Sequence, residues 1–122
     1  MTSRDIGIQW ENAALDHLQR AGLKLVERNF SCRHGEIDLI LRDGDALVFA
    51  EVRYRSDASR GGGTSSVGVV KQRKLVHAAQ TWLQAHPRFA SMPCRFDVIG
   101  CSGALTQPAF DWTRNAFDAF SG

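Results

Sequence analysis

A predicted β-hairpin constrains this chain more than any other feature. Residues 36–41 and 46–53 are strand-like runs that flank Asp43-Gly44-Asp45, a strong hairpin signal. Within the second run, residues 47–50 are apolar without alternation, which is typical of a strand buried on both faces of a sheet. We therefore expect the hairpin to lie inside the sheet and to position whatever polar residues its strands carry.

The turn decides which hairpin residues face each other. A two-residue turn at Gly44-Asp45 pairs Asp43 with Ala46 and places Asp38 opposite Glu51. A turn at Asp43-Gly44 instead places Glu36 opposite Glu51, with Asp38 as a diagonal neighbour. Because side chains alternate along a strand, either register puts four side chains on one face. These are Glu36, Asp38, Glu51 and Arg53.

Two carboxylates facing each other need a positive charge between them. Facing acids on adjacent strands repel, and buried charges in proteins are paired or coordinate a metal. Asp38 and Glu51 therefore form a candidate site for a hard divalent ion such as Mg²⁺. Spacing alone leaves an alternative open, in which these residues make ordinary cross-strand ion pairs, such as Glu36 with Arg53.

The remaining pattern predicts an α/β fold. Apolar spacing predicts a helix over residues 3–21, ended by Gly22, and a second over residues 70–85, ended by Pro87. Strands are expected at residues 23–30 and 95–100, with one more at 108–112 and a short terminal helix over 115–120. The order α-β-β-β-α-β predicts a central mixed β-sheet flanked by helices. We expect residues 1–122 to form a single domain.

Positive charge gathers in one segment. The net charge is only +2, yet residues 53–74 carry six basic residues and one acid. This local excess suits contact with a polyanion, and it is equally typical of a solvated loop and helix face. Residues 56–66, which are rich in Gly and Ser, form the expected loop within this segment.

Composition favours a cytoplasmic protein without a membrane span. No apolar run approaches the roughly 20 residues that a span needs, and the start lacks the layout of a secretory signal. Three cysteines, with no C-x-x-C pair, favour reduced thiols. Cys32 and His34 do not make a zinc site by themselves. For Asp97 we expect a salt bridge to Arg95 or another sheet residue.

Motifs along nearly the whole chain resemble the small bacterial YraN family. The most specific are Gly35-Glu36-Ile37-Asp38 and Phe49-Ala50-Glu51-Val52, with further similar stretches around Glu27-Arg28-Asn29-Phe30, Lys71-Gln72-Arg73-Lys74 and Arg95-Phe96-Asp97-Val98. That family is similar to the PD-(D/E)XK nuclease superfamily of restriction enzymes and Holliday junction resolvases. The resemblance implies a restriction-endonuclease-like fold and a metal-dependent nuclease-type function.

The resemblance also implies roles for particular residues. Asp38, Glu51 and Arg53 correspond to the catalytic motif, and Asp38 and Glu51 would ligate Mg²⁺ or Mn²⁺ for phosphodiester hydrolysis. Glu11 resembles a first-helix glutamate that assists the metal site in some resolvase-like members, although an exposed helix residue is an equal alternative. Nucleic-acid contacts are expected from Arg55, Lys71, Gln72 and Lys74. DNA, including branched DNA, is the expected partner. The resemblance is also compatible with a homodimer, because resolvases work as dimers.

Arg53 departs from the superfamily pattern, which usually has lysine at this position. An arginine keeps the positive charge and can hold phosphate oxygens in a bidentate contact, but it does not deprotonate in proteins and cannot act as a base. The departure therefore supports a second hypothesis, in which the chain is a non-catalytic nucleic-acid-binding or adaptor protein that retains the nuclease fold.

Overall fold

The structure, a computed structural model, describes residues 2–55 and 67–117 of the chain. These residues form two long helices, one short 3-10 turn and five strands. In chain order they are α1 (Ser3–Arg20), β1 (Lys24–Cys32), β2 (Gly35–Asp43), β3 (Ala46–Tyr54), α2 (Val69–Ala85), η2 (Pro87–Phe89), β4 (Cys94–Ala104) and β5 (Gln107–Phe117). The predicted loop at residues 56–66 lies outside the described residues.

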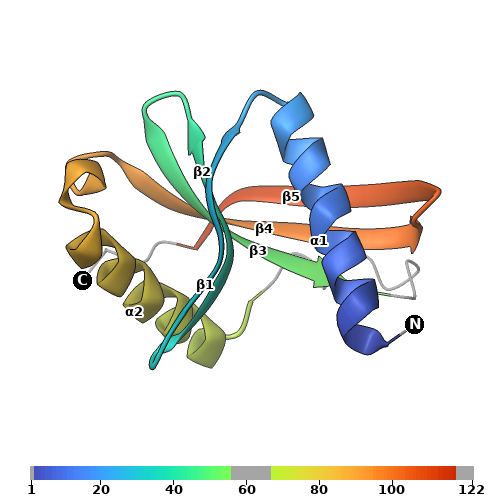
Figure 1. Cartoon of the computed structure of the whole chain (residues 1–122), viewed down its shortest axis with the longest axis horizontal. Coiled ribbons are helices and arrows are strands. Elements are labelled where there is room, and N and C mark those ends of the chain that lie inside the picture. The colour runs from blue at the N-terminus through green and yellow to red at the C-terminus, as the bar shows by residue number, and fades with distance from the viewer. Residues whose placement is uncertain (1, 56–66, 118–122) are drawn as a thin grey trace.

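The strands form one mixed sheet in the order β1-β2-β3-β4-β5, as Figure 1 shows. β3 and β4 pair in parallel, and the other neighbours pair antiparallel. Parallel neighbours need a crossover, and α2 lies in the connection between β3 and β4. The predicted α/β class and mixed sheet are confirmed, with a full fifth strand that completes the order α-β-β-β-α-β-β.

The hairpin has the first of the two predicted registers. Asp43 pairs with Ala46, so the turn is formed by Gly44 and Asp45. Gly44 has φ +58°, the positive value that the first central residue of a type II′ turn requires and that glycine adopts without strain. β3 is the central strand, and its residues 47–51 are buried, as the unbroken apolar run predicts.

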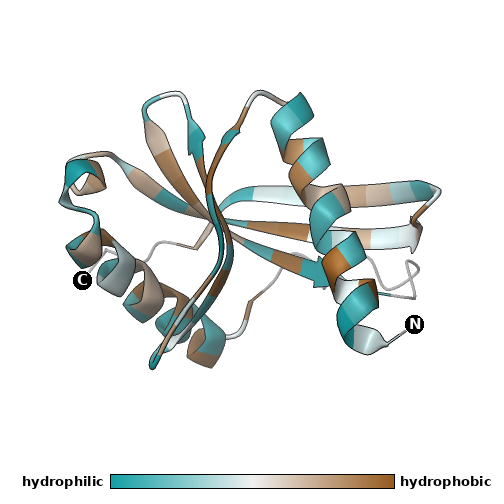
Figure 2. Ribbon diagram, in the orientation of Figure 1, coloured by the Kyte–Doolittle hydropathy of each residue, from teal (hydrophilic) through white to brown (hydrophobic). Residues whose placement is uncertain are grey.

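Two helices cover the two faces of the sheet with separate hydrophobic clusters. Leu47 and Phe49 of β3 pack in the cluster of α2, whereas Val48 and Ala50 pack in the cluster of α1. Both helices show the alternating hydrophobic and hydrophilic segments expected of amphipathic helices (Figure 2). None of the helices in residues 2–55 and 67–117 is long and apolar enough to cross a membrane.

The prediction of a terminal helix beginning at Asn115 is wrong. Asn115, Ala116 and Phe117 belong to β5, and residues 118–120 lie outside the described part of the chain. The pairing of β4 with β5 shifts between Phe96 and Val98, and Asn115 has φ +51° there. This bulge returns Phe117 to the sheet, where its ring stacks on Phe96 with centroids 4.8 Å apart.

Candidate functional site

Asp38 lies where β2 separates from β3. The pairing of these strands ends at Leu39 and Ala50, one residue before Asp38 would face Glu51. There the Asp38 Oδ2 atom accepts a hydrogen bond from the backbone N–H of Val52 at 2.8 Å. The carboxylate thus takes the place of a backbone acceptor in the middle of the sheet, which fixes its position.

Glu51 is the second carboxylate of the site, and its residue is only 7% exposed. The Nζ atom of Lys71, from the first turns of α2, lies 3.4 Å from Glu51 Oε2, while the Nε atom of Arg53 lies 3.9 Å from the same oxygen. Lys71 is therefore the closer of these two cations. The sequence assigned Lys71 to phosphate contacts and did not place it beside the carboxylates, since that proximity depends on how α2 packs.

The surroundings of Asp38 make ionisation of its carboxyl group costly. Burial raises the pKa of Asp38 from its ordinary 3.8 to about 7, and the negative charge of Glu51 adds to this effect. The hydrogen bond from Val52 and the positive charge of Lys71 lower the pKa, but they do not offset the larger causes. The positive charge near the pair therefore does not fully compensate Asp38, and carboxylate oxygens are the hard ligands that a divalent cation such as Mg²⁺ or Mn²⁺ prefers.

The polar side chains of the hairpin have different neighbours. Glu36 and Asp38 line an open hollow beneath α1 together with Val52. Glu51 is adjacent to Val52 in β3 and contacts Lys71 on the side of α2. Regular pairing of β2 with β3 ends at Leu39 and Ala50, so the contacts of Asp38 and Glu51 follow from their surroundings and not from strand alternation. Asp38 and Glu51 nevertheless interact, as the pKa of Asp38 indicates.

Glu11 lines the same hollow as Asp38, but its carboxylate is engaged by a cation. The Nη2 atom of Arg28 lies 2.8 Å from Glu11 Oε1, and its Nε atom donates to the same oxygen at 3.2 Å. Within residues 2–55 and 67–117, no group of three His, Cys, Asp or Glu side chains is placed to hold a metal ion. The carboxylates that come together are therefore Asp38 and Glu51, without Glu11.

The residues expected to contact nucleic acid are placed differently from one another. Gln72 donates its side-chain amide to the Val67 carbonyl at 2.7 Å, which ties the start of α2 to the preceding segment. Lys74 is exposed on α2, one turn after Lys71. Arg55 follows β3 and donates its backbone N–H to the carbonyl of Cys101 at 2.9 Å, which holds it beside β4.

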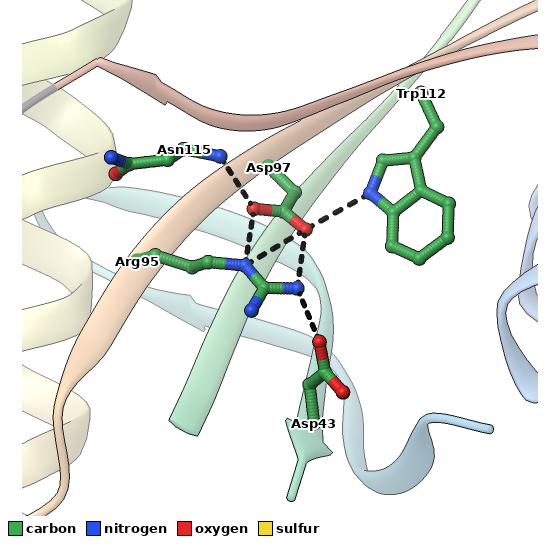
Figure 3. A network of polar contacts seen from close by, with 5 residues as sticks. All are labelled: Asp43, Arg95, Asp97, Trp112 and Asn115. Atoms are coloured by element: carbon green, nitrogen blue, oxygen red, sulfur yellow. Dashed lines mark hydrogen bonds and ion pairs between the residues drawn. The ribbon is translucent and has the colours of Figure 1, made fainter. Parts of the chain in front are cut away.

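Asp97 has a structural role, as the expected salt bridge to Arg95 indicates. Its carboxylate accepts hydrogen bonds from Arg95 Nε at 3.0 Å, from Trp112 Nε1 at 3.0 Å and from the backbone N–H of Asn115 at 3.0 Å, and Arg95 also binds Asp43 at 2.9 Å (Figure 3). The sequence predicted the Arg95 contact, since that residue is two positions away. Trp112 and Asn115 were not predicted, because the bulged strand β5 brings them there.

Comparison with known proteins gives the family of the chain. Residues 10–101 match the model described as "Uncharacterised protein family UPF0102". The chain belongs to the UPF0102 family. A UPF0102 protein of Stutzerimonas stutzeri is 50% identical over 117 residues, which are 96% of this chain and 98% of the relative. One of Xanthomonas campestris pv. campestris is 54% identical over 111 residues, 91% of this chain and 89% of the relative.

The part of the chain that matches the family model contains the whole carboxylate site. Asp38, Glu51 and Lys71 lie inside residues 10–101, whereas β5 lies beyond them. A UPF0102 protein of Pseudomonas fluorescens is 46% identical over 119 residues, 97% of each chain. The similarity of the chain to this family therefore extends over the sheet, both helices and the site.

Proposed function

We propose that this protein binds DNA and hydrolyses its phosphodiester bonds at a divalent-metal site formed by Asp38 and Glu51. The main support for the proposal is the pair of neighbouring carboxylates, Glu51 buried and Asp38 half-buried, in which the pKa of Asp38 is raised to about 7. A protein gains stability by avoiding such a pair, so its presence favours a functional role. The resemblance to the PD-(D/E)XK superfamily supplies the reaction class.

Each residue of the site has a role that follows from its position. Asp38 and Glu51 hold Mg²⁺ or Mn²⁺, and the hydrogen bond from Val52 orients Asp38 for this purpose. A bound divalent ion supplies positive charge at the phosphate and acidifies water. Lys71 and Arg53, which lie 3.4 Å and 3.9 Å from Glu51, donate to the phosphate oxygens and stabilise the charge that develops on them.

The start of α2 supports the binding of a phosphate backbone. α2 begins without a side-chain cap at Gly68 and has no acidic residue in its first turn. The free N–H groups of a helix N-terminus favour anions, and Lys71 and Lys74 add positive charge on the same helix. DNA binding at this position would be weakened by salt, since each phosphate contact releases counterions.

A cleavage assay with Mn²⁺ and Mg²⁺ tests the proposal. Supercoiled plasmid and a synthetic four-way junction are incubated with the purified protein and with the variants Asp38→Ala and Glu51→Ala. We expect metal-dependent cleavage that both variants abolish. The matched control is Asp16→Ala, because the Asp16 side chain is 61% exposed and pairs only with the neighbouring Arg20 on α1 among the contacts described. Cleavage that persists in both site variants would contradict the proposal.

A second function is favoured by Arg53, which cannot act as a base. In this case the protein is a non-catalytic DNA-binding protein that keeps the carboxylate site for metal-assisted contact. It predicts salt-sensitive binding of the junction without metal-dependent cleavage. Replacing Arg53 with lysine then separates the two: cleavage gained by Arg53→Lys would indicate that the arginine alone prevents turnover.

A further inference from the structure

The hollow beside Asp38 is larger than a metal site requires. It has a volume of about 610 Å³ and is open to solvent between α1 and the strands β1, β2 and β3. Pockets of this size commonly take an organic group rather than an ion alone. The hollow therefore offers room for a part of the substrate next to the carboxylate that would hold the metal.

One wall of the hollow is a fixed aromatic surface. The rings of Tyr54 and Trp10 stack with centroids 4.5 Å apart and planes at 24°. Trp10 is 3% exposed and belongs to the hydrophobic cluster under α1, whereas Tyr54 is 42% exposed. Tyr54 is thus held by a buried partner while it lines the open space, which is the arrangement of a stacking surface for a flat group.

The rim of the hollow is polar and can hydrogen-bond to such a group. Asn29, Ser31 and Glu36 line it and are exposed, and Arg4 adds a positive charge. Asn29 lies in β1 with φ +54°, a conformation that non-glycine residues rarely adopt inside a strand. An amide, a hydroxyl and a carboxylate beside an aromatic ring provide the donors and acceptors that the edge of a nucleobase needs.

We propose that this hollow receives one unpaired DNA base, stacked on Tyr54, and so places the adjoining phosphate at Asp38. This inference rests on the proposed function and names its substrate class. A base inside an intact duplex must be unstacked and unpaired before it can enter, which costs free energy. The protein therefore prefers single-stranded or branched DNA with unpaired nucleotides over continuous duplex.

Fluorescence of a base analogue tests the inference without any cleavage. The probe is a short single-stranded oligonucleotide that carries one fluorescent adenine analogue, and the competitor is the same sequence in a full duplex. Binding is measured by anisotropy in the absence of metal. We expect the analogue to be quenched on binding, because its ring stacks on Tyr54, and we expect the duplex to compete poorly.

Variants of Tyr54 test how much its ring contributes to oligonucleotide binding and to the quenching. Tyr54→Ala weakens binding of the oligonucleotide roughly tenfold and removes the quenching, since stacking on one aromatic ring contributes about this much. Tyr54→Phe keeps both, because the ring remains. The matched control is Leu105→Ala, which removes a side chain of similar exposure, 41%, from the turn between β4 and β5.

A second variant blocks the hollow without removing the aromatic pair. Gly7 lines the hollow on α1, and a Cβ atom at this position meets no atom within 4 Å. Gly7→Leu is compatible with the helix and adds a side chain that fills the space. We expect it to abolish the quenching while the thermal unfolding midpoint stays at or above that of the wild type.

The outcomes separate this inference from the proposed function. Binding without quenching, or equal binding by Tyr54→Ala and Leu105→Ala, would overturn the base site and leave hydrolysis at Asp38 untouched. Quenching that depends on Tyr54, in a protein that cleaves no DNA with Mn²⁺, supports the base site and overturns hydrolysis. Failure to bind any oligonucleotide at low salt would overturn both.

Discussion

Two aspartates in the same sheet, Asp97 and Asp38, have opposite environments. Asp97 is 1% exposed and accepts hydrogen bonds from Arg95, Trp112 and Asn115 (Figure 3). Asp38 accepts one backbone N–H and has a second carboxylate as its neighbour. The hydrogen bonds and the ion pair of Asp97 offset the cost of burying its charge. The single hydrogen bond of Asp38 does not offset the cost for that residue.

The contrast between Asp97 and Asp38 separates a structural acid from a functional one. Both residues are acids on strands that are shielded from water, Asp97 fully and Asp38 in part, so shielding alone does not define their roles. The number of hydrogen-bond donors distinguishes the two residues. Asp97, which accepts from a guanidinium, an indole and a backbone N–H, stabilises the fold. Asp38, which accepts from one backbone N–H, is available to bind a cation or a proton. We therefore expect substitutions at the two positions to change stability in opposite directions.

The largest expected effect is at Asp97. Asp97→Ala leaves the Arg95 guanidinium and the Trp112 indole without their shared acceptor, and breaking a buried ion pair is strongly destabilising. Because Arg95 retains its contact with Asp43, we expect the lower end of the range, a loss of about 3 kcal/mol in the free energy of unfolding. Urea denaturation measures it. An unchanged midpoint would show that Asp97 is not structural.

Asp38→Asn should raise the free energy of unfolding, whereas Asp97→Ala should lower it. A raised pKa means that the folded protein binds the Asp38 proton more tightly than the unfolded chain does. The stability that this provides is complete below the ordinary pKa of 3.8 and is lost as the pH rises through about 7. The amide cannot ionise and can still accept from Val52. We expect the variant to be more stable than the wild type by about 2 kcal/mol at pH 8 and similar to it at pH 4.

The control for this pH dependence is Asp16→Asn on the exposed side of α1. Its stability relative to the wild type should change by less than about 0.5 kcal/mol across the same pH range. Urea denaturation at several pH values gives both curves. A stability difference for Asp38→Asn that does not grow between pH 4 and pH 8 would contradict the uncompensated charge.

Trp112→Phe removes one hydrogen-bond donor from Asp97. A smaller aromatic ring replaces the indole, and Nε1, which donates to Asp97 Oδ2 at 3.0 Å, is lost. A hydrogen bond to a charged group contributes about 1.5 kcal/mol or more, and we expect a loss of about that size. Combined with Asp97→Ala, the second substitution should add little, because the acceptor is already gone. Full additivity in urea denaturation would argue against a shared network.

Local sequence signals predicted the hairpin and its acids. The Gly44-Asp45 turn sets the register from Asp43 and Ala46, and the unbroken apolar run marks β3 as buried. What alternation could not predict is the end of the β2–β3 pairing at Leu39. Beyond it, the side chain of Asp38 accepts a hydrogen bond from the backbone of Val52.

Contacts between distant parts of the chain account for the other differences between the predictions and the structure. Lys71 reaches Glu51 only because α2 packs against the sheet after a connection whose path the sequence does not define. The three-residue spacing of Phe117 and Phe120 suits a helix. The bulge opposite Asp97 instead places Asn115 and Phe117 in a strand. Both cases concern contacts between residues distant in the chain, for which periodicity carries no information.

The smallest expected effect is the stabilisation of the folded protein by Mn²⁺, and it is the most direct test of what distinguishes Asp38. At about five times its dissociation constant, a bound ion stabilises the folded state by about 1 kcal/mol. Because the ion competes with a proton on a carboxyl whose pKa is about 7, the thermal shift should be larger at pH 8 than at pH 6. Asp38→Asn should remove the shift, whereas Asp16→Asn should keep it. Equal shifts at both pH values, or a shift that survives Asp38→Asn, would place the ion elsewhere and would leave Asp38 as a half-buried acid without a cation.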